Sequence, residues 1–268
     1  MKIAVLSDNH HAGSGEQQAV QSHFDSMGHG VPAMRRRWRR GLHRMRRQWW
    51  NTYPETRSAC FEQAVEDVKR FDPDLVVAAG DYGGDVWGVG ISHDHTFESV
   101  REVVERLRAE FPDRCRFIYG DHELGKYSTD VRHGGIRIQS LIRGERELGI
   151  RSFWHECRGD YHLIGINSTL ITLELFLNEA VEHEIPVWED YRREHMQEVI
   201  DGFESLPRDA RVLLFCHDPG ALSVLAALRP VHRRRNQIER TVLGHLHSPR
   251  LMPLTRIVSH VVRWAPQY

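Results

Sequence analysis

A recurring unit constrains the fold of this chain: a short apolar run that ends abruptly in ionisable side chains. The runs cover residues 3–6, 74–79, 115–119, 211–216 and 241–243, and Asp or His follows each within two residues. Continuous apolar runs of this length are typical of buried strands. An ionisable side chain costs free energy when it is buried without a partner. We therefore expect these strand ends to meet around something charged, at the carboxyl edge of a sheet.

The segments between the strands predict helices, so the fold class is α/β with packed layers. At 268 residues and 40% hydrophobic content, the chain can bury one sizeable core. Residues 1–268 are expected to form a single domain, with an Arg-rich insertion at about 28–52. Residues 12–33 are expected to form a loop. The predicted helices cover residues 34–50, 55–70, 96–110, 134–149, 189–203 and 221–228, and further strands cover residues 152–155 and 161–166.

The sequence predicts a cytoplasmic location. It opens directly on the apolar run at residues 2–6, without the h-region and cleavage site of a signal peptide. No apolar run reaches the length of a transmembrane helix. The four Cys residues are far apart, with no C-x-x-C pair, which is typical of free thiols in a reducing compartment.

The side chains at the strand ends are of types that bind metal ions. A D-x-H or H-x-H spacing puts alternate residues on the same side of an extended loop. Carboxylate and imidazole without thiolate suit manganese, iron, zinc or nickel. The candidates are too many for one tetrahedral ion, and two ions that share a carboxylate are typical of phosphoester hydrolysis. The metal-ligand candidates are Asp8, His10, Asp81, Asp121, His217, His245 and His247.

In this order, the motifs resemble those of the calcineurin-like metallophosphoesterases. The resemblance spans residues 8–247 and implies a layered β-sandwich flanked by helices. Each motif alone is a weak signal, whereas five in order, each after a strand, make a strong one. The matching motifs are D-x-H at Asp8 and His10, G-D at residues 80–81, G-N-H-[ED] at residues 120–123, a lone His at His217, and G-H-x-H at residues 244–247.

The resemblance also implies a role for each position. Hydroxide bridging two divalent ions would attack phosphorus, with manganese as the expected metal and iron, zinc or nickel as alternatives. Asp8, His10 and His247 would hold the first ion, Asp81 would bridge, Asp121, His217 and His245 would hold the second, and His122 would protonate the leaving oxygen or stabilise the transition state.

Two positions depart from the family's pattern. Asp121 stands where the family has Asn, which adds a negative charge and should make the bridging water less acidic. The second acid of the G-D-x-x-[DN] motif is Asp85 here, one residue late. Asp85 is therefore a candidate for orienting the catalytic His122 through the flexible glycines, and the alternative is that this role is vacant. Glu123 is expected to anchor the loop rather than bind metal, and His11, His93 and His95 are expected to be loop residues rather than ligands.

Residues 34–50 combine one apolar stripe with Arg on the other faces of a predicted helix. Three hypotheses are open for this segment. Its stripe packs on the body of the protein, or its Arg side chains receive an anionic substrate, or it lies on an anionic membrane surface. The candidate substrate-binding residues are Arg39, Arg40, Arg233 and Arg234.

The expected function is a binuclear phosphodiesterase or pyrophosphatase acting on an anionic small-molecule or lipid-linked substrate. The branch of Ser/Thr protein phosphatases is disfavoured, because Val86 stands where that branch carries Arg. A nuclease is one alternative, in which the Arg- and Trp-rich segment tracks a phosphate backbone. A catalytically weak metal-binding scaffold is the other.

Overall fold

The computed structural model describes residues 1–18, 58–85, 88–125 and 134–245. The predicted helix at 34–50, the insertion at 28–52, and the candidates Arg39, Arg40 and His247 lie outside these residues. Within them, no helix is both long enough and apolar enough to cross a bilayer.

The first of two sheets is parallel and has the order β1-β2-β3, with β1 (Ile3–Leu6), β2 (Leu75–Ala78) and β3 (Cys115–Phe117). The central strand β2 is buried along its whole length, as its apolar run predicts. Strand β1 is outermost in this sheet, and its Val5 stays 39% exposed, so burial on both faces was a wrong expectation for β1.

The second sheet has the order β4-β5-β6-β7. Strands β5, β6 and β7 run parallel, and β4 pairs antiparallel with β5 through a tight hairpin. The four strands are β4 (Phe153–Arg158), β5 (Tyr161–Ile166), β6 (Arg211–Cys216) and β7 (Ile238–Leu243).

The two sheets pack face to face, which confirms the predicted layered sandwich. Strand residues alternate between faces, and the inward-facing apolar side chains of both sheets form one cluster. Trp154 fixes the contact, because its indole N–H donates to the Phe117 carbonyl oxygen of the other sheet at 3.1 Å. The buried residues of this inner cluster are Leu75, Val77, Ala79, Ile118, Trp154, Leu163 and Phe215.

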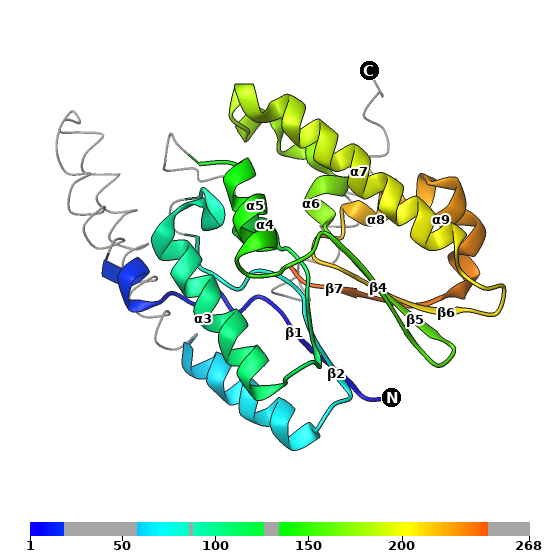
Figure 1. Cartoon of the computed structure of the whole chain (residues 1–268), viewed down its shortest axis with the longest axis horizontal. Coiled ribbons are helices and arrows are strands. Elements are labelled where there is room, and N and C mark those ends of the chain that lie inside the picture. Colours follow the sequence, from blue (N-terminus) through cyan, green and yellow to red (C-terminus); the bar gives the residue numbers. More distant parts are fainter. Residues whose placement is uncertain (19–57, 86–87, 126–133, 246–268) are drawn as a thin grey trace, which may run out of the picture.

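Helices cover both outer faces (Figure 1). The helix over residues 58–71, α3 (Asp94–Glu110) and α5 (Ile138–Arg146) bury their apolar sides on the first sheet. The second sheet is covered by α7 (Ile185–Glu204), α8 (Ala221–Ala227) and α9 (Arg229–Arg234). The short elements are α4 (Asp121–Leu124), α6 (Ser168–Ile171), η1 (Gly90–Ser92), η2 (Leu173–Leu175), η3 (Leu177–Glu179), η4 (Glu182–Glu184) and η5 (Arg235–Gln237).

Several boundaries differ from the sequence-based prediction, including the starts of α5, α7 and β7, which lie at Ile138, Ile185 and Ile238 rather than at 134, 189 and 241. Residues 14–18 are helical rather than part of a loop. Strand β3 ends at Phe117, and the charged motif after it starts the helical turn α4. Strand β4 continues to Arg158, three residues beyond the predicted end, because cross-strand pairing with β5 extends it through polar residues that carry no apolar signal.

The contact between Trp154 and Gly165 predicts a stability effect. These residues are direct cross-strand partners, and a Cβ at position 165 would lie 2.1 Å from Trp154 Cε2. Gly165→Ala should therefore displace the indole and lower the free energy of unfolding by about 1–3 kcal/mol. Urea unfolding of both proteins measures this difference.

The matched control is Gly159→Asn in the turn of the same hairpin. Gly159 has a φ of 61°, and a Cβ there would meet nothing within 4 Å. Asn tolerates this backbone region, so this variant should stay within about 0.5 kcal/mol of the unsubstituted protein. An equal loss in both variants would contradict the proposed clash with Trp154.

Candidate metal centre

Backbone hydrogen bonds join the carboxyl ends of β1 and β2 and those of β6 and β7, and the His217 side chain joins the two sheets through the Ala79 carbonyl. The Asp8 amide donates to the Gly80 carbonyl at 3.1 Å, and the His10 amide donates to the Asp81 carbonyl at 3.0 Å. On the second sheet, the Gly244 amide donates to the Cys216 carbonyl at 3.3 Å. The expected convergence of these strand ends is thereby confirmed for the described residues.

The backbone at these ends adopts the left-handed conformation, which turns the chain sharply after each strand. Asp8, His10, Asp81 and His245 have φ angles of 58°, 45°, 57° and 60°. Asp and His are among the few non-glycine residues that tolerate this region. Each such residue still costs free energy, and such residues cluster at functional sites. The sharp turns direct the ligand-type side chains toward one another.

Asp81, Asp121, His217 and His245 form the first group of metal-ligand atoms. One nitrogen or oxygen from each lies within 4.8 Å of all the others. His217 Nε2 is 3.2 Å from Asp81 Oδ2 and 3.4 Å from Asp121 Oδ1, and His245 Nδ1 is 3.4 Å from Asp121 Oδ1. Two ligands of one ion, each bonded at about 2.0–2.2 Å, are about 3.0–3.5 Å apart. The spacing therefore fits a divalent cation.

His10, Asp81 and His122 form a second group, and it shares Asp81 with the first. His10 Nε2 and His122 Nε2 lie 3.8 Å and 3.9 Å from Asp81 Oδ2. The two rings meet edge to face with centroids 4.6 Å apart. Asp81 Oδ1 accepts a hydrogen bond from the His122 backbone amide at 3.1 Å, which leaves Oδ2 directed at both groups.

Buried charge makes this centre favourable for cations. Asp81 and Asp121 are 0% and 5% exposed. Burial raises the pKa of Asp81, but the charges of His217 and His122 outweigh burial and hold that pKa below its usual range. Burial lowers the pKa of His217, and Asp81 and Asp121 together raise it well above its usual range. The carboxylates thus stabilise positive charge at the position that a metal ion would take.

Two buried atoms of the centre directly support the interpretation that it holds a metal ion. Asp81 Oδ2 and His217 Nε2 are buried and lie 3.2 Å apart, yet among the described residues neither makes a hydrogen bond of good geometry. A buried polar atom without a partner is costly in a folded protein. The other ring nitrogen of His217 donates to the Ala79 carbonyl at 2.7 Å, which fixes Nε2 toward both carboxylates. Metal-binding His residues are held in this manner.

Glu123 anchors the ends of β2 and β3, as the sequence predicts. Its buried carboxylate accepts hydrogen bonds from the amides of Asp81 and Tyr82, each at 2.8 Å, and of Gly120 at 2.9 Å. Burial and the charge of Asp81 raise the pKa of Glu123 to about 7. The carboxylate therefore positions the loop of Asp81 and is absent from both groups of metal-ligand atoms.

His122 is oriented by the backbone of the loop after β2. Its Nδ1 donates to the Gly84 carbonyl at 3.1 Å, which directs Nε2 into the second group. The Asp85 carboxylate accepts from the amides of Val89 and Gly90 at 3.1 Å and 2.9 Å. Asp85 thus shapes the same loop, while the carbonyl that holds His122 belongs to the residue before it.

Asp8 and His11 belong to neither of the two groups found among the described residues. Asp8 lies at the end of β1 and accepts a hydrogen bond from Ser7 Oγ. His11 contacts Ser58 at 2.9 Å and Glu102 at 2.7 Å, as befits a loop residue.

Arg233 and Arg234 are in α9, which precedes β7. Arg234 donates to the Pro207 carbonyl, before β6 begins. Both Arg residues therefore lie at the amino ends of β6 and β7, opposite His217 and His245, and the structure does not bring them to the metal centre.

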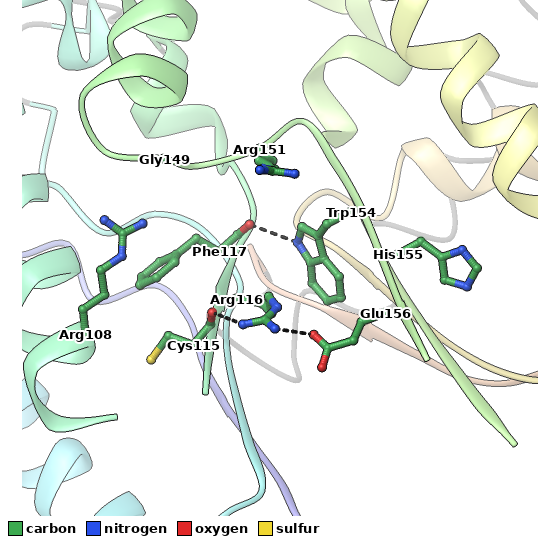
Figure 2. A pocket seen from close by; sticks show the side chains of 9 residues that line it. All are labelled: Arg108, Cys115, Arg116, Phe117, Gly149, Arg151, Trp154, His155 and Glu156. Carbon is green, nitrogen blue, oxygen red and sulfur yellow. Dashed lines mark hydrogen bonds and ion pairs between the residues drawn. The ribbon is translucent and has the colours of Figure 1, made fainter. Parts of the chain in front are cut away.

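A cavity of about 430 Å³ lies elsewhere, between the edge strands β3 and β4 (Figure 2). Arg108, Arg116 and Trp154 are among its lining residues, and no member of the two ligand groups at the strand ends lines it. Arg116 pairs with Glu156 at 2.6 Å, and Arg108 donates to the Leu148 carbonyl at 2.6 Å. Because these side chains already have partners and lie away from the strand ends, the cavity is not part of the metal centre.

The backbone carbonyls of Ala79 and Gly84 could not be found from the sequence. Each orients a His ring, yet a carbonyl is common to every residue and carries no sequence signal. The nearest clue is their place, directly before the G-D motif and within the following Gly-rich loop.

Comparisons with known proteins agree with this geometry. The sequence model of the calcineurin-like phosphoesterase family matches residues 1–249. Among solved structures, phosphopantetheinyl hydrolase from Mycobacterium tuberculosis is similar to 92% of this chain and 83% of its own, with 13% identity and a TM-score of 0.41. No curated protein sequence matches the chain. Because the family match spans nearly the whole sequence, the chain belongs to the calcineurin-like phosphoesterase family and is a metal-dependent phosphoesterase.

Proposed function

We propose that the protein hydrolyses a phosphodiester or pyrophosphate bond in an anionic substrate, with two divalent ions held at the strand ends. The observation that carries this proposal is the sharing of Asp81 by two groups of ligand atoms. Asp81, Asp121, His217 and His245 would hold one ion. His10 and Asp81 would hold the other, with Asp8 and His247 as further ligands. Bound divalent ions lower the pKa of a coordinated water and polarise phosphoryl oxygens.

The protein's own side chains would then position the substrate and move the proton. His122 would donate a proton from Nε2 to the leaving oxygen, because Nδ1 is engaged by the Gly84 carbonyl. The close contact of the His10 and His122 rings keeps this donor beside the proposed ions. We propose that the Gly84 carbonyl fills the orienting role expected of Asp85, whose carboxylate holds the loop in place.

The chemical class of the substrate is tested by a screen of the purified full chain. Phosphomonoesters, phosphodiesters and nucleotide pyrophosphates are offered with manganese, and the screen is repeated with iron, zinc and nickel. Turnover of the second or third class above the first supports the proposal. Faster turnover of monoesters would contradict the proposed substrate class, and failure of every substrate with every metal would contradict catalysis itself.

Replacement of the shared carboxylate should remove metal and activity together. Asp81→Asn keeps the shape of a side chain that is 0% exposed but removes its charge. We expect the hydrolysis of bis(p-nitrophenyl) phosphate to fall at least about 100-fold, with loss of bound metal measured by elemental analysis. Asp113→Asn is the control, because Asp113 has the same left-handed backbone (φ 60°) and belongs to neither group. Full activity in Asp81→Asn would refute the shared-ligand arrangement.

The variant His122→Asn tests whether His122 donates a proton or binds a metal ion. A general acid contributes about 10²–10⁴-fold when the leaving group needs a proton. We therefore expect a large loss with methyl phenyl phosphate, a much smaller loss with methyl p-nitrophenyl phosphate, and unchanged metal content. His11→Asn, next to the same strand end, should alter neither rate. Equal losses on both substrates together with lost metal would identify His122 as a ligand instead.

Asp121→Asn introduces the residue that the family's motif carries. The amide keeps one oxygen but removes a negative charge 3.4 Å from His217 and His245. We expect metal affinity to fall about 10-fold or more. The acidic limb of the pH–rate profile should move to lower pH, because less ligand charge leaves the ion more acidic.

Asp218→Asn is the matched control for this charge change. Asp218 follows His217 directly, but its carboxylate accepts from the Gly220 amide and is outside both groups. A comparable shift of the profile in Asp218→Asn would show that the local charge, rather than the ligand at position 121, sets the acidic limb.

A further inference from the structure

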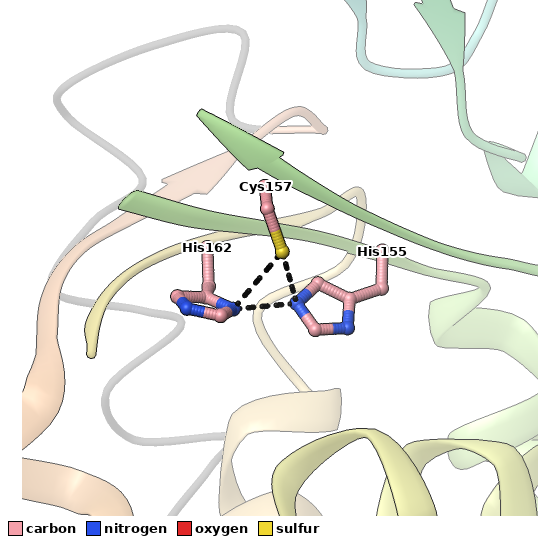
Figure 3. A group of neighbouring side chains, drawn as sticks. All are labelled: His155, Cys157 and His162. Carbon is pink, nitrogen blue, oxygen red and sulfur yellow. Dashed lines mark hydrogen bonds between the residues drawn. The ribbon is translucent and has the colours of Figure 1, made fainter. Parts of the chain in front are cut away.

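Strands β4 and β5 carry a second kind of ligand cluster, which the phosphoesterase reaction does not use. His155, Cys157 and His162 place two imidazole nitrogens and one thiol within 4.8 Å of one another. His155 and Cys157 are two residues apart on β4, so they point to the same face of the strand. His162 is the direct cross-strand partner of Cys157. Figure 3 shows the three side chains converging on one point.

The cluster faces away from the interior of the sandwich. Trp154 and Leu163 belong to the inner cluster between the sheets, so the alternate residues His155, Cys157 and His162 point to the outer face. Cys157 is exposed, His155 is half-buried and His162 is buried. A metal ion can therefore reach the thiol from solvent without opening the core.

The separations of the three ligand atoms fit a tetrahedral ion. His155 Nε2 is 2.9 Å from His162 Nδ1, and Cys157 Sγ is 3.5 Å from His162 Nδ1 and 3.9 Å from His155 Nε2. With zinc bonds of about 2.0–2.1 Å to nitrogen and 2.3 Å to sulfur, tetrahedral neighbours are about 3.3–3.6 Å apart. The 3.5 Å separation matches. The two ring nitrogens are about 0.4 Å closer than a tetrahedral ion requires and the 3.9 Å pair is about 0.3 Å farther apart, so binding requires the rings to shift by a few tenths of an ångström.

We infer that His155, Cys157 and His162 form a zinc site that clips the β4–β5 hairpin. Mixed imidazole and thiolate ligands favour zinc over the oxygen-seeking cations magnesium and calcium. On binding, the Cys157 thiol releases its proton to solvent and the thiolate ligates the ion. Among the described residues no fourth His, Cys or carboxylate joins the three, so water completes the tetrahedron.

This site is separate from the catalytic centre. His162 pairs with Val212, five residues before His217 along β6. At about 3.3 Å per residue, the two sites are about 16 Å apart along the strands. Among the ligand groups of the described residues, the two catalytic groups contain only carboxylates and imidazoles, and the hairpin group alone includes a thiol, so a thiolate–metal bond reports on the hairpin site.

That difference in ligands provides the test. Cobalt(II) added to the reduced full chain, in excess over the catalytic ions, should give a thiolate-to-cobalt charge-transfer band in the near ultraviolet with the intensity of one thiolate–cobalt bond per chain. Zinc in excess over all the sites should abolish the band. Cys157→Ser should lack the band and bind one metal ion fewer, and its phosphoesterase activity should be unchanged. Cys60→Ser is the matched control, because Cys60 is also a free, exposed thiol, and it should behave as the unsubstituted protein does.

A second measurement needs no substitution. Zinc should slow alkylation of Cys157 at least about 10-fold, whereas Cys60 in the same sample should react at the same rate with and without zinc. Zinc at about 100 times its dissociation constant should also raise Tm by about 5 °C more in the unsubstituted protein than in Cys157→Ser, because both proteins keep the catalytic centre. No charge-transfer band, a band that persists in Cys157→Ser, or equal alkylation with and without zinc would overturn the inference.

Discussion

The metal centre depends on one buried carboxylate that binds no metal in the proposed arrangement. Glu123 accepts hydrogen bonds from backbone amides on both sides of the gap between β2 and β3. These bonds hold the two strand ends so close that a Cβ at Gly120 would lie 2.2 Å from Asp81 Oδ1. Asp81 and the α4 turn with Asp121 and His122 are therefore fixed relative to each other. A carboxylate with several amide donors can remain charged while buried.

Burial of Glu123 also increases the electrostatic demand for cations. Three carboxylates, Asp81, Asp121 and Glu123, lie within one buried region; the charge of Asp121 disfavours ionisation of Asp81, and the charge of Asp81 disfavours ionisation of Glu123. The His rings compensate in part, and the raised pKa of His217 shows how strongly positive charge is favoured there. Divalent ions bring more positive charge than imidazolium groups do. The ligands and the anchor thus act together to make the ion-bound state the stable one.

The sequence predicted the sheets, their outer helices and the convergence of the strand ends, because apolar runs and the Asp and His residues after them are local signals. It also identified Glu123 as an anchor. It did not predict α4, since a four-residue turn has no periodicity. It missed the Gly84 carbonyl, because backbone atoms have no sequence signature. The predicted strand ended at His155, so the sequence did not indicate that Cys157 is a neighbour of His162. In the structure, pairing with β5 extends β4 to Arg158.

The left-handed backbone at Asp8, His10, Asp81 and His245 separates what favours folding from what favours catalysis. Glycine would relieve backbone strain at each position, but glycine offers no ligand. Selection for stability alone would therefore favour glycine at these positions and remove the ligands. Asp121 lies in the right-handed turn α4, where glycine would relieve no strain. Left-handed backbone alone does not locate the centre, because Asp72 and Asp113 adopt it elsewhere. The centre is marked by the convergence of several such residues whose side chains are all of ligand type.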